Sequence, residues 1–247
     1  MMSDRPVVGV VGPEAEAAVR AVRAAGGDPD PGMATAVVGD CEYVVAVGEP
    51  ALLAVARARP EVPVLPVGAG RGVQSVPRQA VAAGVEALLA GEFDRETHPL
   101  VGVRVADRTR ATVLCDALAA SAEPAKISEY AVHAGGERLA QFRADGVVVA
   151  TPAGSSGYAG AAGGPTVAPG TGVAVVVPVA SFATDDDHWV VDLGEVRVTV
   201  ERDETAVQLV ADDRAVGPVD TTDAVCLSPV GSVSVAVVAA SASPFGD

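Results

Sequence analysis

The pattern of apolar and polar positions changes part-way along the chain. In the first part, short apolar runs rich in β-branched residues alternate with stretches that favour helix. The apolar runs predict buried strands at residues 6–11, 43–47 and 62–67. The stretches between them predict helices at residues 14–25, 51–59 and 77–90. This alternation favours a parallel sheet covered by helices.

From about residue 98 onward the helical stretches give way to short strand-like runs separated by turn residues. These runs cover residues 100–105, 109–115, 126–133, 146–150, 173–177, 189–191, 196–201, 206–210 and 232–238. Their even spacing indicates an all-β sandwich. The sequence therefore predicts an α/β Rossmann-like domain over residues 1–95 and a β-sandwich domain over residues 96–247.

Composition adds information about the core and about partners. Aromatic residues make up only 3% of the chain, so the core must be built mainly from Val, Ala and Leu. The formal net charge is -15, and Lys126 is the single lysine. Such an acidic surface repels phosphodiester backbones and anionic membranes. We therefore expect no nucleic-acid partner and no membrane partner.

The same acidity is typical of proteins from a salt-rich cytoplasm, because carboxylates stay hydrated there and salt screens their repulsion. We hypothesise such a halophilic setting. It predicts that dialysis to low salt lowers the melting temperature and changes the far-UV circular dichroism spectrum. An unchanged spectrum and melting temperature would remove the support for this idea.

The cysteines and the N-terminal residues indicate the cellular compartment. Cys41, Cys115 and Cys226 are far apart and form no Cys-x-x-Cys pair, so neither a zinc site nor a disulfide framework is indicated. We expect reduced, mostly buried thiols. No apolar run reaches the length of a membrane span, and the first residues lack the pattern of a signal peptide. We expect a soluble, cytoplasmic protein.

The most informative segment is residues 145–165, where a strand breaks into a glycine-rich loop. Residues 147–150 are apolar and β-branched, and Pro152 then removes a backbone donor and ends the strand. The loop that follows offers the hydroxyl of Ser156, the flexible backbone of Gly157 and the flat ring of Tyr158. A loop of this kind can hold a purine and a ribose.

Taken in order, Asp145-Gly, then Thr151-Pro-Ala-Gly-Ser-Ser-Gly-Tyr158, then Gly163-Gly-Pro resembles the signature of the NAD kinase family. The resemblance implies an α/β domain followed by a β-rich one, with the substrate in the cleft between them. It implies transfer of a phosphoryl group from ATP or polyphosphate, with Mg²⁺ or another divalent cation, to the 2′-hydroxyl of the adenosine ribose of NAD(H), giving NADP(H). It assigns substrate contacts to Arg143, Asp145, Ala153, Ser156, Gly157, Tyr158, Ala161, Asp212 and Arg214.

The family's phosphate motif, Gly-Gly-Asp-Gly-Thr, falls by position on Val47-Gly48-Glu49-Pro50-Ala51. In that motif glycine amides and a helix N-terminus bind phosphate, while the carboxylate accepts the proton of the attacking hydroxyl. Gly48 and the carboxylate of Glu49 remain, but Pro50 removes an amide donor and Ala51 removes a hydroxyl. An ordinary helix start is the other interpretation of Glu49-Pro50. Both stay open.

Two further motifs are altered. The family's Asn-Glu pair corresponds to Cys115-Asp116, where Asp116 can still accept from ribose hydroxyls but Cys115 cannot replace an amide. A buried thiol beside a surface carboxylate is the alternative interpretation of this pair. The turn at residues 64–72 resembles the family's Gly-x-Asn-x-Gly-x-x-Gly, with Gly68 in place of the Asn. The chain also ends soon after Val238, so we expect no C-terminal segment that returns to the first domain.

Two functions remain open at this point. One is an NAD kinase with Glu49 as its base, and the other is a catalytically impaired member that binds NAD(P)(H) or another adenine nucleotide as a sensor or partner subunit. A Rossmann oxidoreductase is disfavoured because the first strand ends without Gly-x-Gly-x-x-Gly. The resemblance implies a homodimer or homotetramer with sites completed by a neighbour. It also predicts that Glu49, Asp116, Asp145 and Tyr158 line one cleft.

The three histidines are scattered. We interpret His98, His133 and His188 as surface or capping residues rather than as metal ligands.

Overall fold

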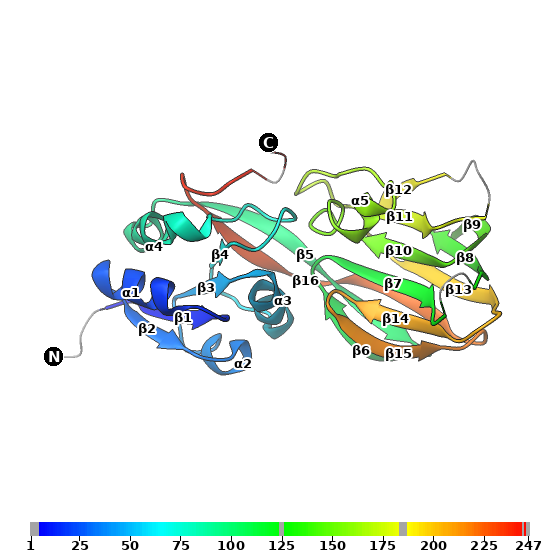
Figure 1. The fold of residues 1–247 in the computed structure, drawn as a ribbon, viewed down its shortest axis with the longest axis horizontal. Helices are drawn as coiled ribbons and strands as arrows, with labels where there is room; N and C mark the ends of the chain where they lie inside the picture. The colour runs from blue at the N-terminus through cyan, green and yellow to red at the C-terminus, as the bar shows by residue number, and fades with distance from the viewer. Residues whose placement is uncertain (1–4, 124–125, 183–186, 244, 246–247) are drawn as a thin grey trace. The chain divides into compact units, whose positions relative to one another are not determined.

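The computed structural model describes residues 5–123, 126–182, 187–243 and 245, and the chain forms two compact units (Figure 1). Unit 1 comprises Met1–His98 together with Ser232–Asp247, and unit 2 comprises Pro99–Gly231. The first boundary thus lies three residues beyond the predicted one. The assignment of the last sixteen residues differs more: they belong to unit 1, not to the β-rich unit.

Two long strands, β5 (Asp94–Val105) and β16 (Ala224–Val237), account for this difference because each has residues in both units. Val235 of β16 pairs in parallel with Val64 in unit 1. The expectation that no C-terminal segment returns to the first domain is therefore wrong. The apolar run at residues 232–238 is a buried strand of the α/β sheet rather than a strand of the sandwich.

Unit 1 is built around a parallel sheet in the order β2-β1-β3-β4-β16. Its other strands are β1 (Val7–Val11), β2 (Asp28–Pro31), β3 (Tyr43–Val47) and β4 (Val64–Val67). Its helical segments are α1 (Glu16–Ala24), α2 (Ala34–Val37), α3 (Glu49–Ala58), the 3₁₀ turn η1 (Arg78–Ala80) and α4 (Val81–Ala90). Parallel strands joined by helices require both faces of the sheet to be covered, which explains the continuous apolar runs in the sequence.

Opposite faces of this sheet bury alternate residues of each strand. Val8 and Val10 pack in one core with Val22 of α1 and Leu88 of α4. Between them, Gly9 faces α2, where Val37 lies so close that an added Cβ would approach its side chain to 3.1 Å. The α/β architecture predicted from the alternating pattern is confirmed.

Unit 2 is a sandwich of two antiparallel sheets. One sheet has the order β12-β11-β10-β7-β14-β15, and the other contains β5, β6, β8, β9, β13 and β16. The bounds are β6 (Arg108–Val113), β7 (Asp116–Ser121), β8 (Ser128–Ala134), β9 (Glu137–Ala144), β10 (Gly146–Ala150), β11 (Val173–Val179), β12 (Trp189–Asp192), β13 (Val196–Arg202), β14 (Val207–Ala211) and β15 (Arg214–Val219). The short helix α5 (Tyr158–Ala161) follows β10. Side chains from both sheets share one core, so the predicted sandwich is confirmed.

Several strands escaped the pattern for identifiable reasons. β2 has the sequence Asp-Pro-Asp-Pro, and two prolines are tolerated because this strand lies at the sheet edge. β7 lies in the middle of its sheet but contains mostly Ala, Ser and Asp, which have low strand propensity, so no β-branched run marks it. β9 and β15 are edge strands with several exposed positions.

Among the residues that the structure describes, no helix is both long and apolar enough to cross a membrane.

Candidate functional site

The glycine-rich loop after β10 is anchored to the turn that precedes β7. The hydroxyl of Thr151 donates to the carbonyl oxygen of Leu114 at 2.6 Å, and the Thr151 amide donates to the carbonyl oxygen of Cys115 at 2.8 Å. Asp116 pairs with Ala150 in the register of the two strands. The loop and the Cys115-Asp116 pair, far apart in sequence, therefore lie side by side at one end of the sandwich.

Gly154 makes this close approach possible. A Cβ atom at this position would lie 2.2 Å from the carbonyl oxygen of Cys115, and the contact is with backbone that cannot swing away. We expect Gly154→Ala to lower the free energy of unfolding by about 1–3 kcal/mol through overpacking, and to weaken nucleotide binding because the loop must shift. Gly194→Ala is the matched control, since a Cβ there meets nothing within 4 Å. Denaturant unfolding of both variants checks this, and equal stability would contradict it.

The two serines of the loop have different roles. Ser155 is fully buried; its hydroxyl donates to the Pro152 carbonyl oxygen at 2.7 Å and accepts from the Val167 amide at 2.9 Å. These bonds hold the loop from inside. Ser156 is partly exposed, and Gly157 and Tyr158 are exposed, the tyrosine by 47%. A buried residue thus shapes the loop, while its neighbours present a hydroxyl, backbone and an aromatic ring to a ligand.

The remaining loop positions assigned by the resemblance differ in accessibility. Ala153 is buried beneath the loop, whereas Ala161 at the end of α5 is exposed. Arg214 is exposed at the start of β15, at the hairpin that also carries Asp212.

Asp212 supports the turn that carries Cys115 and Asp116. Its Oδ1 accepts from the amides of Cys115 at 2.8 Å and Asp116 at 3.1 Å, and its Oδ2 accepts from the Leu114 amide at 3.1 Å. The backbone of Asp212 has a φ of 51°, a left-handed conformation that Asp tolerates better than most residues. The carboxylate that the resemblance assigns to the substrate therefore holds the turn on which Asp116 sits.

Arg143 and Asp145 lie at the other end of β10. The five residues of β10 separate Asp145 from Thr151, roughly 20 Å at the rise of a β-strand. The guanidinium of Arg143 lies 5.7 Å from the ring centre of Phe182 and 3.3 Å from Glu204 Oε1. The strand between them holds Asp116 and Asp145 of one chain apart, at opposite ends of β10. That both residues line one cleft stays a prediction.

The altered phosphate motif lies where the parallel strands of unit 1 end. Helix α3 begins at Glu49, directly after Gly48, whose φ of 90° turns the chain out of β3. This start agrees with the helix-start interpretation of Glu49-Pro50. The carboxylate of Glu49 is exposed and lies close to Gly70 in the turn after β4, where an added Cβ would be 3.1 Å from Oε2. The carboxyl ends of parallel strands are where such sheets bind ligands.

Arg78 joins this group and was not identified from the sequence. Its side chain packs on Gly68 and reaches Gly48, and its Nη1 lies 3.4 Å from Glu14 Oε2. No motif marks Arg78 because it is ten residues beyond Gly68 along the chain. The run of glycines that leaves room for its side chain was the only available signal.

Comparison with known proteins places the chain. Residues 116–228 match the family model described as the ATP-NAD kinase C-terminal domain. The NAD kinase of Methanopyrus kandleri is 30% identical over 172 residues, which cover 68% of this chain and 62% of that protein. The chain belongs to the NAD kinase family.

Other relatives agree with this family, as does the fold. The NAD kinase of Methanosarcina barkeri is 51% identical over 71 residues, 29% of this chain and 26% of that protein. The chain thus spans less than two thirds of the curated relatives it matches. An NAD kinase from Archaeoglobus fulgidus in complex with ATP superposes with a TM-score of 0.76 at 21% identity, over 94% of this chain and 92% of that one. Yeast NADH kinase complexed with NADH gives 0.78 at 15% identity, over 96% and 84%.

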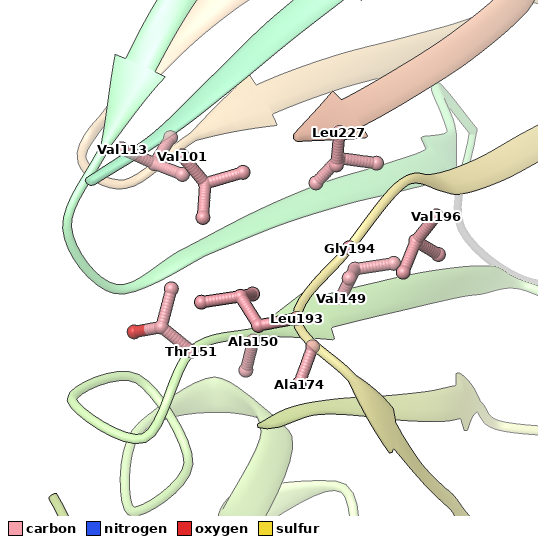
Figure 2. A pocket seen from close by; sticks show the side chains of 10 residues that line it. All are labelled: Val101, Val113, Val149, Ala150, Thr151, Ala174, Leu193, Gly194, Val196 and Leu227. Atoms are coloured by element: carbon pink, nitrogen blue, oxygen red, sulfur yellow. The ribbon is translucent and has the colours of Figure 1, made fainter. Parts of the chain in front are cut away.

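A small cavity inside unit 2 is not a nucleotide site. It lies between the two sheets, where Val101, Val113 and Leu227 face Val149 and Ala174 (Figure 2). Its volume of about 10 Å³ is about the space that one water molecule needs. Two larger open grooves, of about 540 Å³ on unit 2 and 480 Å³ on unit 1, contain none of the predicted site residues.

The histidine and cysteine expectations need correction for this NAD kinase family member. His98 is fully buried, and its Nε2 lies 2.7 Å from Glu96 Oε1. The hydrogen bond with His98 lowers the pKa of Glu96 despite partial burial.

Of the thiols, Cys41 is buried but Cys115 and Cys226 are only half-buried, and burial raises the pKa of Cys41 and Cys226. Within the described part of the chain, no three His, Cys, Asp or Glu side chains group as metal ligands.

Proposed function

We propose that this protein phosphorylates the 2′-hydroxyl of the adenosine ribose of NAD(H), using ATP or polyphosphate, and so produces NADP(H). The observation that carries this proposal is the position of Glu49. Its carboxylate is exposed at the carboxyl end of β3, beside the glycine turn after β4. A carboxylate in such a place can act as a general base for an attacking hydroxyl.

In the proposed reaction Glu49 takes the proton of the ribose 2′-hydroxyl as that oxygen attacks the terminal phosphorus of the donor. The bond between this phosphorus and the bridging oxygen breaks, and the donor leaves as ADP or as a polyphosphate one unit shorter. The N-terminus of α3 favours the negative charge of the phosphates, although Pro50 offers no amide. Phosphoryl transfer depends mainly on such positioning and charge stabilisation.

A divalent cation would bind at this site together with the phosphates of the donor. Mg²⁺ commonly binds substrate phosphates and waters with one or two protein carboxylates. The exposed carboxylate of Glu49 and the lack of a three-ligand group among the described residues agree with that mode. The cation would neutralise charge on the phosphate oxygens.

The adenosine end of the dinucleotide is proposed to bind the surface of unit 2 formed by Asp116 and the loop after β10. Asp116 can accept from ribose hydroxyls, Ser156 and Gly157 can bond to polar groups, and the exposed ring of Tyr158 can stack on adenine. Hydrogen bonds of Thr151, Ser155 and Asp212 hold the loop and the turn that carry these residues.

A coupled assay of NADP formation with NAD, Mg²⁺ and either ATP or polyphosphate, run at high and low salt, tests this function. Turnover that depends on the donor supports it. A parallel titration of NAD separates the two readings of the altered motif. Tight NAD binding without turnover under every donor and salt condition would favour the second candidate, a nucleotide-binding member without kinase activity. The loss of the Pro50 amide favours that candidate.

We further propose that two chains complete each dinucleotide site. Within one chain Arg143 and Asp145 lie at the opposite end of β10 from Asp116 and Tyr158, and we propose that the Arg143 end contacts a dinucleotide bound to another chain. A symmetric dimer would bring the two ends together twice. These proposals, with nucleotide substrates in solution, also imply a cytoplasmic setting.

Mixed dimers test this arrangement. Glu49→Gln and Arg143→Ala are each expected to be inactive alone, whereas co-expression should restore about one quarter of wild-type activity, because half of random dimers are mixed and each has one intact site. Co-expression that restores nothing, with dimers present by light scattering, would contradict shared sites.

A further inference from the structure

We propose that Arg78 binds the phosphate chain of the phosphoryl donor, compensating for the amide that Pro50 removes. This inference rests on the proposed function, since it concerns the donor side of the same site. It assigns a role in recognising polyphosphate to a residue outside the matched motifs.

The side chain of Arg78 lies across the ends of two neighbouring strands. A Cβ at Gly68, after β4, would be 2.9 Å from Arg78 Cγ and 3.1 Å from Nε. A Cβ at Gly48, after β3, would be 3.3 Å from Nη2. The guanidinium thus reaches the first turn of α3 by lying on glycine backbone, and a side chain at either glycine would displace it.

A phosphate chain bound at this position needs a positively charged group beside it. The start of α3 carries Glu49, and Glu14 is also close, in a chain with a net charge of -15. Without a positive group, a polyphosphate would meet two carboxylates and a proline where donors are needed. Arginine supplies a planar fork of N–H donors that matches phosphate oxygens.

The ion pair with Glu14 does not block this role. Its atoms are 3.4 Å apart and the side chains are exposed by 47% and 82%. Exposed pairs of this kind are weak, so a polyphosphate can displace the carboxylate. Glu14 therefore acts as a competitor for the guanidinium. A purely structural surface pair would instead leave ligand binding unchanged when either partner is altered.

Calorimetric titration of the protein with inorganic tripolyphosphate and Mg²⁺ at moderate salt tests the proposal without requiring turnover. We expect Arg78→Ala to weaken binding roughly tenfold to a hundredfold, as for loss of a charged hydrogen-bonding partner, and Arg78→Lys to restore part of it. Glu14→Gln should tighten binding. Arg20→Ala, which removes an exposed arginine of α1, is the control for net charge.

Opposite outcomes separate this inference from the proposed function. Binding unchanged in Arg78→Ala and in Glu14→Gln, with wild-type protein that binds tripolyphosphate, would overturn the role of Arg78 alone. Wild-type protein that binds neither tripolyphosphate nor ATP would overturn both. Arg78-dependent binding without NADP formation would support Arg78 and contradict the kinase. If Arg78→Ala fails to fold, the Glu14→Gln result still decides.

Discussion

Glu49→Gln is expected to reduce the turnover of NAD phosphorylation by roughly 100- to 10,000-fold, the range typical of a lost general base. The amide has nearly the same shape as the carboxylate but cannot take up the ribose proton. Because Glu49 is exposed and lies in the first turn of α3, its replacement should leave folding unchanged. NAD binding should also be retained.

The measurement is kcat from the NADP assay together with separate titrations of NAD and tripolyphosphate. Glu86→Gln, which changes an exposed glutamate of α4, is the control for the lost charge. Normal kcat in Glu49→Gln would contradict Glu49 as the base. A parallel loss of NAD binding would show instead that the substitution has disturbed the site as a whole.

Asp212→Ala is expected to lower the free energy of unfolding by about 3 kcal/mol and to weaken NAD binding strongly. Three backbone amides, those of Leu114, Cys115 and Asp116, donate to its carboxylate. Without that acceptor the turn loses its support, and with it the position of Asp116. The loop after β10 is affected too, because Thr151 is bonded to the same turn.

A matched control separates hydrogen bonding from backbone strain. Asp107 has a φ of 60°, close to the 51° of Asp212, and lies exposed in another hairpin of the same unit. Asp107→Ala therefore carries a similar strain penalty without the loss of the three bonds. Urea unfolding and NAD titration of the two variants compare them. Equal destabilisation would show that strain, rather than the bonds of the carboxylate, accounts for the effect.

These two predictions address different parts of the family's chemistry. Glu49 and Arg78 belong to the proposed donor side, where the sequence departs most from the family motif. Asp212, Thr151 and Gly154 support the turn and the loop of the proposed nucleotide side, where the motif is well kept. A protein without its general base would lose turnover but still bind NAD, whereas a protein without the support of Asp212 would lose NAD binding as well. The two variants together therefore distinguish loss of the base from loss of the nucleotide-binding surface.

Local sequence was sufficient to predict an element where the residues of one short segment determine the conformation of that same segment. β10 and the loop after it could be predicted because a β-branched run, Pro152 and the glycines of the loop act on their own backbone. The alternation of strands and helices likewise predicted the parallel sheet of unit 1, since buried parallel strands must be apolar throughout. By contrast, β7 is held in place by its neighbours β10 and β14, and its alanines give no local sign of a strand.

By itself the sequence determined the fold class, the glycine-rich loop after β10 and the family, because these depend on residue types at fixed spacing. Only the tertiary structure decided that Ser232–Asp247 joins the first unit, that Asp145 and Asp116 lie at opposite ends of β10, and that Asp212 holds a turn. It also placed Arg78 across Gly48 and Gly68. These features arise from contacts between segments distant along the chain, and such contacts are specified by packing and hydrogen bonding in the folded state rather than by any local pattern.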